Sequence, residues 1–231
     1  MKLTTIASGS TGNCYILTAD NGRKILLDCG VKLQTIITHK DFGWLKDYEF
    51  VYVSHSHKDH SKSMADLEHY GATVVSYQAP VLKPTKFGQF IIKMFHLKHN
   101  VDNYGIIILD TITKERFCYV TDFVELPQIK NVDTLLMEVN YDIDIINNRI
   151  DEWGLDGLNS GFKNHFSLQQ AEDWLVHNPT GIKNLIICHI SKDNANRDKI
   201  LKTLTPLAEN VSLAYQFSIG VKNEKILYYK N

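Results

Sequence analysis

The sequence predicts an α/β protein in which two β-sheets pack face to face and helices cover their outer surfaces. Two observations predict this fold class. Short apolar runs rich in Val, Ile, Tyr and Phe fall into two blocks punctuated by Gly, Asp and Asn, and segments of helical periodicity lie between them. With 231 residues, 44% hydrophobic and 22% charged, the chain resembles an ordinary globular protein, and we expect residues 1–231 to form one domain.

The expected elements follow the chain in order. Each predicted strand is an apolar run that ends at turn residues; in the first half these runs are 2–8, 14–20, 24–30, 50–55, 73–77, 89–97, 104–110 and 116–123. Helical spacing interrupts them at 31–39 and 62–70. The second half predicts strands at 134–140, 184–191, 211–217 and 225–230, a polar loop at 154–163, and helices at 167–177 and 196–204. Ser167 has the side chain of a helix N-cap.

Charge and targeting signals restrict the class of protein. The formal net charge is −1, so no global positive field gathers long polyanions, and Lys192, Arg197, Lys199 and Lys202 form one candidate basic cluster. The N-terminus lacks a signal-peptide core, and no run of about 18 apolar residues occurs, so we expect a cytoplasmic protein without membrane contact. Four single cysteines in apolar runs are expected to be buried, reduced thiols: Cys14, Cys29, Cys118 and Cys188.

The stretch "SGSTGNCY" at residues 8–15 has the composition of a phosphate-cradling loop or of a tight turn. A P-loop requires a lysine and a following helix, whereas here Asn13 and a strand follow. Gly9 and Gly12 are therefore interpreted as turn residues between two strands.

The strongest chemical signal is "SHSHKDHS", which gives the spacing H-x-H-x-D-H directly after an apolar strand. Alternation along an extended chain places His55 and His57 on one side, while Asp59 and His60 lie around the bend. Two adjacent metal sites could each receive two ligands in this way. Imidazole and carboxylate suit Zn²⁺ best, and Mn²⁺ or Fe would also fit.

This motif resembles that of the metallo-β-lactamase-fold hydrolases, whose fold is a four-layer αββα sandwich, and the later motifs of that family follow in order. "KHNVDNYG" supplies His99 as the third motif, with His96 as a rival that lies inside the predicted strand; "CYVTDF" supplies Asp122 and "LIICHIS" supplies His189. The resemblance implies one metal ion held by His55, His57 and His99, a second held by Asp59, His60 and His189, and Asp122 as the bridge between them.

The segment "NHFSLQQA" resembles the corresponding segment of ribonuclease Z-like and WalJ/YycJ-like phosphodiesterases, which implies that His165 is the general acid. "LLMEVNYD", "HISKDNANRD" and "SGSTGNCYIL" resemble WalJ/YycJ segments as well, although that family has a His where Tyr141 stands. The resemblance makes four residues candidates for substrate contact: Ser10, Asn13, Asn140 and Ser167. Asp59 is expected to orient or deprotonate the attacking water in addition to binding metal.

Together these features predict a phosphodiesterase in which two divalent ions activate water, acting on a small cyclic nucleotide, as phage anti-Pycsar enzymes do, or on a DNA or RNA end. One alternative is a WalJ/YycJ-like exonuclease or a ribonuclease that acts on polymers only. A second is a thioester hydrolase or another non-phosphate hydrolase of the same fold. Relatives are commonly homodimers, and a homodimer is plausible here.

Overall fold

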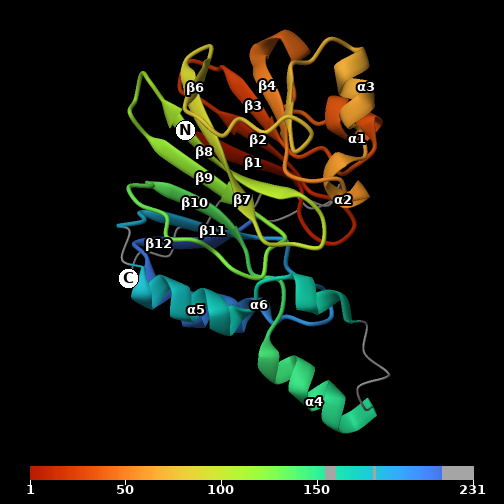
Figure 1. Ribbon diagram of the computed structural model, residues 1–231, viewed down its shortest axis with the longest axis vertical. Coiled ribbons are helices and arrows are strands. Elements are labelled where there is room, and N and C mark those ends of the chain that lie inside the picture. Colours follow the sequence, from red (N-terminus) through yellow and green to blue (C-terminus); the bar gives the residue numbers. More distant parts are fainter. Residues whose placement is uncertain (154–159, 179–180, 215–231) are drawn as a thin grey trace.

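The computed structural model describes residues 1–153, 160–178 and 181–214. It contains two β-sheets that pack face to face, with helices on the outer side of each (Figure 1). The predicted four-layer α/β sandwich is therefore confirmed. Among the described residues, no helix is both long enough and apolar enough to cross a bilayer.

The first sheet has five strands in sequence order: β1 (Lys2–Ala7), β2 (Cys14–Thr18), β3 (Lys24–Leu27), β4 (Tyr48–Val53) and β5 (Val74–Ser76). β1, β2 and β3 pair antiparallel, whereas β3, β4 and β5 pair parallel. Its outer side carries α1 (Leu33–Ile37) and α3 (Met64–His69); the short helices η1 (Leu45–Asp47) and α2 (Lys58–Ser61) lie in the connections.

The second sheet has seven strands in the order β12-β11-β10-β9-β8-β7-β6. They are β6 (Thr85–Phe87), β7 (Phe90–Leu97), β8 (Asn103–Asp110), β9 (Arg116–Val120), β10 (Thr134–Glu138), β11 (Asn184–Cys188) and β12 (Asn210–Leu213). β9 to β12 run parallel, so their carboxyl ends meet at one edge of the sheet. α5 (Leu168–His177) and α6 (Arg197–Leu204) cover the outer face, and η3 (Ser160–Asn164), η4 (Thr205–Leu207) and α4 (Ile143–Trp153) complete the second half.

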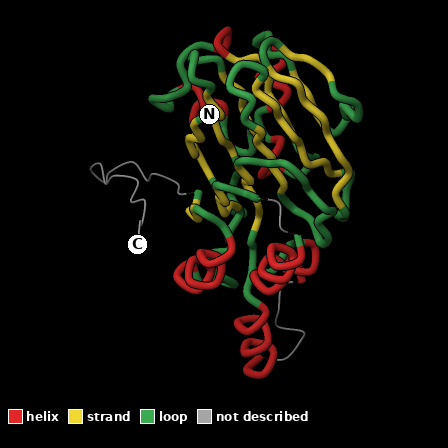
Figure 2. Tube along the Cα trace, turned by 90° about the vertical axis from the view of Figure 1, so that its left-hand side faces the viewer, coloured by secondary structure: helices red, strands yellow, loops and turns green. Residues whose placement is uncertain are grey.

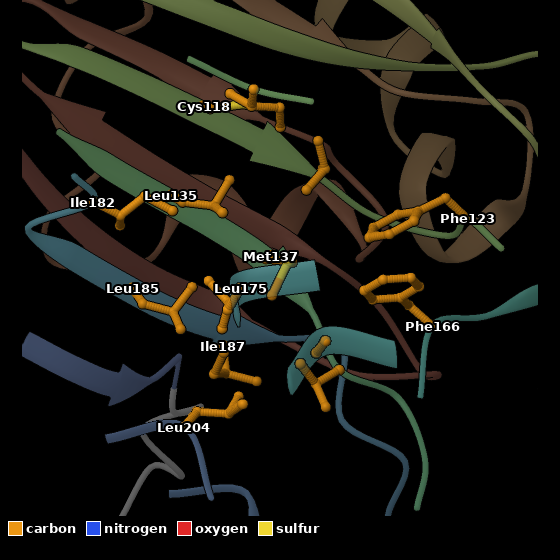
Figure 3. Close-up of a cluster of buried hydrophobic side chains, with 14 of the residues drawn as sticks. Cys118, Phe123, Leu135, Met137, Phe166, Leu175, Ile182, Leu185, Ile187 and Leu204 are labelled. Carbon is orange, nitrogen blue, oxygen red and sulfur yellow. The ribbon is translucent and has the colours of Figure 1, made fainter. Parts of the chain in front are cut away.

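Strand alternation builds the core in layers. In β2, Tyr15 and Leu17 face the second sheet, whereas Cys14 and Ile16 face the outer helices. A third cluster fills the space between the second sheet and its helices (Figure 3). There Phe123 and Phe166 pack ring against ring at a centroid distance of 4.6 Å, and each directly follows a polar residue discussed below. The four cysteines are free and buried, as predicted.

Most predicted elements are found, with bounds that differ by a few residues. Among the described residues, the structure adds β6, which pairs with β7 as a hairpin, α4, which extends away from the body of the molecule (Figures 1 and 2), and the short helices η1, α2, η3 and η4. Within residues 143–152 of α4, whose side chains the structure describes, only Ile146 is buried. Asn147 and Asn148 are weak helix formers, so the helical signal in the sequence is faint. Residues 154–159 of the predicted loop, residues 215–217 and the predicted strand at 225–230 lie outside the described residues.

Candidate metal centre

The histidines and acids singled out in the sequence come together where strands of both sheets end. His55 follows β4, His99 follows β7, Asp122 follows β9 and His189 follows β11. Parallel pairing brings β9, β10 and β11 to a common edge, and α2 carries Asp59 and His60 toward that edge from the other sheet. Segments far apart in the sequence thus contribute to a single cluster of side chains.

The cluster contains two groups of potential metal ligands that share one residue. The first group is His55, His57, His99 and Asp122; the second group is Asp59, His60, Asp122 and His189. Within each group, one donor atom per residue lies within 4.8 Å of all the others.

Asp122 offers a different oxygen to each group. Its Oδ2 lies 3.6 Å from His55 Nε2 and 3.9 Å from His99 Nε2. Its Oδ1 lies 3.2 Å from His60 Nε2 and 3.4 Å from His189 Nδ1. A carboxylate that faces two neighbouring groups with separate oxygens is placed to bridge two cations.

Three observations show that the residues fit divalent metal ions. Ligand atoms about 2.0–2.1 Å from a tetrahedral ion are about 3.3 Å apart, close to the 3.3 Å between Asp59 Oδ2 and His189 Nε2 and the 3.4 Å between His57 Nδ1 and His99 Nε2. His55 Nε2 is buried, and among the described residues it has no hydrogen-bond partner. The donor set of imidazoles and carboxylates is also one that divalent ions of the zinc type prefer.

Asp28 supports the cluster from behind. Its Oδ2 accepts hydrogen bonds from Tyr119 Oη and from His60 Nδ1, each at 2.6 Å, and its Oδ1 accepts one from the Ser54 backbone N–H at 2.8 Å. A carboxylate at Nδ1 fixes the ring of His60 and leaves Nε2 directed at the cluster. Ser54 Oγ links the same carboxylate to His55 Nδ1, 3.0 Å away.

The opening turn at residues 8–15 lies against the segment that carries Asp59 and His60. The Asn13 backbone N–H donates to the Asp59 carbonyl at 2.7 Å, and the Cys29 N–H donates to the His60 carbonyl at 2.8 Å. Gly30 is needed for this approach, because a Cβ atom at that position would lie 1.6 Å from the Asp59 carbonyl oxygen. The stretch "SGSTGNCY", which has the composition of a phosphate-cradling loop, therefore packs against α2 through Asn13.

Of the four residues predicted to contact substrate, the structure leaves one exposed. Ser10 lies on the surface of the opening turn. Asn13 is fully buried, and its amide bonds with Gly9 and Tyr15 and lies 3.1 Å from His60 Nε2.

The polar side chains of Asn140 and Ser167 also make hydrogen bonds within the protein. Asn140 donates to the His189 carbonyl at 2.9 Å, and Ser167 Oγ caps α5 by accepting from the Gln170 N–H. Burial and hydrogen bonds within the protein occupy polar atoms of Asn13, Asn140 and Ser167, so each helps to position its neighbours, and their contact with substrate stays a prediction.

The structure also separates the two rival histidines. His99 belongs to the first group, and its Nδ1 lies 3.1 Å from the carbonyl of Asn164, which fixes Nε2 toward the cluster. His96 is exposed on β7, with its ring 5.7 Å from that of Tyr104. The placement favours His99, as the sequence does.

His165 lies at the edge of the cluster beside a residue that the sequence analysis did not assign. Its Nδ1 is 2.5 Å from Glu138 Oε1, and Glu138 also lies 3.2 Å from His189 Nδ1 and accepts the Asp122 backbone N–H through Oε2. Glu138, His165, Asp122 and His189 form a third group of potential ligands. The signal in the sequence was an acid at the end of a buried strand, two residues before Asn140.

The electrostatics of the two groups differ. Burial, reinforced by the neighbouring imidazole of His60, lowers the pKa of His55 to about 2, and burial also lowers the pKa of His99. In the second group burial opposes the charged form of His189, but Asp122, Asp59 and Glu138 together raise its pKa to about 10. Burial likewise opposes protonation of His165, and Glu138 beside it raises the pKa of that ring.

Three residues of this edge have left-handed backbone conformations that residues other than glycine rarely adopt. They are Asp28, Asp122 and His189, with φ of 55°, 54° and 50°. Each stands just after the end of its strand, where the chain turns to direct a side chain inward. Such conformations persist where the surrounding structure holds them, and they concentrate at functional sites.

Comparisons with known proteins agree with this architecture. The family model described as Anti-Pycsar protein Apyc1 matches residues 4–75. No curated protein sequence matches the chain.

Three solved structures are similar over nearly the whole chain. They are the metallo-beta-lactamase fold protein YhfI from Bacillus subtilis (18% identity, TM-score 0.69, covering 93% of this chain and 96% of that one), the short form of human tRNase Z (15%, 0.65, 94% and 98%) and unliganded yeast PDE1 (11%, 0.65, 93% and 97%). The chain therefore has the metallo-β-lactamase fold that its motifs predict, and residues 4–75 carry the match to the Anti-Pycsar Apyc1 family.

Proposed function

We propose that this protein is a metal-dependent phosphodiesterase with two divalent ions, Zn²⁺ as first choice and Mn²⁺ as the alternative. His55, His57 and His99 would hold one ion, and Asp59, His60 and His189 the other, with Asp122 between them. The observation that carries the proposal is the division of the Asp122 oxygens between two ligand groups beside the His165–Glu138 pair. Two adjacent ions held by these residues would supply an activated water and positive charge for the oxygens of a phosphoryl group.

The protein's own residues complete the reaction. Asp59 has a quarter of its side chain exposed, so its carboxylate can orient the attacking water as well as bind metal. Glu138 holds Nδ1 of His165 and raises the pKa of that ring, so the imidazolium is available to donate a proton from Nε2. That proton goes to the departing oxygen. Ser10, which is exposed on the opening turn, is a candidate for contact with the rest of the substrate, and contact by Asn13, Asn140 and Ser167 stays a prediction.

The chemistry of the comparison proteins supports this class of reaction. One of the similar structures is a tRNase Z and another is named PDE1, and each is similar over almost the whole chain at low identity. The candidate substrates are a small cyclic nucleotide, which the Anti-Pycsar Apyc1 match at residues 4–75 favours, and a DNA or RNA end, which the likeness to tRNase Z favours. Hydrolysis of a thioester or another non-phosphate ester is the alternative reaction, and the cytoplasmic location and homodimer stay predictions from the sequence.

The test uses the His165→Ala variant with two kinds of leaving group. Zn²⁺ content should stay at the wild-type level. Cleavage of a nucleotide diester, whose leaving alcohol needs a proton, should fall by about 10²–10⁴-fold, whereas cleavage of bis-p-nitrophenyl phosphate, which has a good leaving group, should fall much less. His96→Ala is the matched control and should change neither quantity.

Two results would contradict the proposal. Wild-type enzyme loaded with Zn²⁺ or Mn²⁺ that cleaves no phosphodiester, across bis-p-nitrophenyl phosphate, 3′,5′-cyclic nucleotides, DNA and RNA, would remove the reaction class. An equal loss on both leaving groups in His165→Ala would remove the role of His165 as acid while leaving the reaction class intact.

A further inference from the structure

Glu138 is a buried carboxylate that belongs to neither of the first two ligand groups. Its side chain is fully enclosed by the protein. Its Oε1 lies 2.5 Å from His165 Nδ1 and 3.2 Å from His189 Nδ1, and its Oε2 accepts the Asp122 backbone N–H. Burial of a carboxylate requires compensating partners, and Glu138 finds them in imidazole rings that can themselves bind metal.

Glu138 and its neighbours form the third ligand group described above. One donor atom from each of Asp122, Glu138, His165 and His189 lies within 4.8 Å of all the others. His189 Nδ1 is 3.4 Å from Asp122 Oδ1, and His165 Nδ1 is 3.8 Å from Asp122 Oδ2. These separations, with the 3.2 Å between His189 and Glu138, are near the spacing of roughly 3.3 Å between ligands on a tetrahedral ion.

The short contact between Glu138 and His165 is a hydrogen bond, which a metal ion would have to widen. An increase from 2.5 Å to about 3.3 Å gives the spacing of two ligands on one ion. His165 can supply this movement, because 18% of its side chain is exposed and it follows the short helix η3. Accommodating an ion thus requires one side chain to move and leaves the enclosed carboxylate in place.

The third group shares two of its four residues with the other groups. Asp122 faces the first two groups with separate oxygens, and His189 directs Nε2 at Asp59 of the second group, 3.3 Å away. Glu138 and His165 are the two residues that the third group does not share. With two unshared ligands and two other ions nearby, an ion in this group would be held more weakly than either of those two.

We propose that Glu138 and His165 form a third divalent-cation site, which fills only when metal is in excess and then inhibits the enzyme. This inference rests on the proposed phosphodiesterase function, in which His165 donates a proton. Binding exchanges one proton for the ion: the Nδ1 proton goes to solvent, and the Nδ1 lone pair goes to the metal. The ring keeps a proton on Nε2 but is neutral, so it no longer serves as an acid for the departing oxygen.

The two unshared ligands determine which ion would act in this way. An imidazole nitrogen and a carboxylate oxygen suit Zn²⁺, whereas Mg²⁺ prefers oxygen ligands and keeps several of its waters. Excess Zn²⁺ should therefore inhibit the enzyme, and the same concentration of Mg²⁺ should not.

The first experiment counts bound zinc by equilibrium dialysis, independently of turnover. Wild-type protein should bind two Zn²⁺ per chain, and a third at a free zinc concentration more than about tenfold higher, because the third site has fewer ligands of its own. The third step should be lost in His165→Ala and in Glu138→Gln, and the first two steps should remain. Glu138→Gln removes the charge but retains an acceptor for the Asp122 N–H, so the variants and the wild type should differ only at excess zinc.

The control variant is His177→Ala, which removes a histidine that also pairs with a carboxylate. His177 Nδ1 lies 3.2 Å from Asp173 on the exposed side of α5, away from the cluster. This variant should keep all three binding steps. Loss of the third step in His177→Ala, or its survival in both cluster variants, would identify an adventitious surface ion and overturn the inference. Saturation of the wild type at two ions would also overturn it.

The second experiment follows turnover as Zn²⁺ is raised beyond two equivalents. Cleavage of a nucleotide diester should fall toward the level of His165→Ala, by about 10²–10⁴-fold, whereas cleavage of bis-p-nitrophenyl phosphate should fall much less, because its leaving group needs no proton. Mg²⁺ is the matched control ion and should inhibit neither reaction. Equal inhibition of the two substrates by Zn²⁺ would overturn the inhibitory role.

Failure of the proposed function would give a different result. If no phosphodiester is cleaved at any zinc concentration, dialysis still decides whether the third site exists. A third binding step that depends on Glu138 and His165 would then establish the site, and only its inhibitory role would be lost with the reaction.

Discussion

The two ligand groups share Asp122 but are built in different ways. In the first group, burial keeps His55 neutral, with a pKa of about 2, and His99 is fixed by a backbone carbonyl. In the second group, His60 and His189 face carboxylates that favour the protonated rings, and Asp28 and Asn140 fix them through side-chain hydrogen bonds. Burial keeps His55 of the first group unprotonated and ready to bind metal, whereas His60 and His189 of the second group must release protons when metal binds.

Asp122→Ala tests what the two groups share and has the largest expected effect. Both ions should be lost, because each group loses the oxygen that faces it. The loss of several kcal/mol of transition-state stabilisation corresponds to a fall on the order of 10³-fold in kcat/KM. Metal analysis of the purified protein, with His99→Ala alongside, checks the sharing: His99→Ala should retain about one ion per chain, and equal retention in the two variants would show that Asp122 does not bridge.

The Asp28→Asn substitution should weaken metal binding more in the second ligand group than in the first. The carboxylate holds His60 directly but reaches His55 only through Ser54 Oγ. We expect about a 10- to 100-fold loss of metal affinity in the second group. Ser54→Ala is the matched variant, because Ser54 Oγ lies between Asp28 and His55. It should lower the metal affinity of the first group, and by a smaller factor. Chelator competition measures the two metal-binding steps separately. A greater loss of affinity in Ser54→Ala than in Asp28→Asn would contradict the role of Asp28 as the main support of the second group.

The pH dependence of metal binding should differ between the groups by up to tenfold per pH unit. Because His189 has its pKa raised to about 10, a proton must leave it before metal binds, so affinity in the second group should rise between pH 6 and 9. His55, with a pKa of about 2, carries no proton in that range, so affinity in the first group should change little. Zinc titrations at pH 6, 7.5 and 9 measure this, and parallel pH slopes for the two steps would contradict it.

The same shift has an opposite consequence for the metal-free fold. The raised pKa of His189 contributes stability that is fully present below the unfolded value of about 6.5 and is lost as pH rises toward about 10. Chelated protein should therefore lose this contribution on going from pH 6 to pH 10, the direction in which metal binding strengthens.

The sequence predicted much of the cluster because its motifs are local. H-x-H-x-D-H places four side chains close together in the chain, and the resemblance to the metallo-β-lactamase-fold hydrolases, whose later motifs follow in order, implied Asp122 and His189. Glu138 was not assigned because its role depends on strand register: β10 lies between β9 and β11, with Glu138 opposite Cys188 and Met137 opposite Val120, which sets its carboxylate between Asp122 and His189. The burial of Asn13 likewise depends on contacts with residues 59 and 60, which no local pattern reveals.

The left-handed backbone at Asp28, Asp122 and His189 limits which residues can occupy these positions, and it affects how readily the neighbouring strand ends open. Glycine would relax the chain at each of these positions but would remove the side chain that the site requires, so stability and chemistry select opposite residues there. Backbone held in this way is sustained by its surroundings, and metal binding energy would add to that support. We infer that amides at the ends of β3, β9 and β11 exchange hydrogen earlier than those in the middle of the same strands once metal is removed.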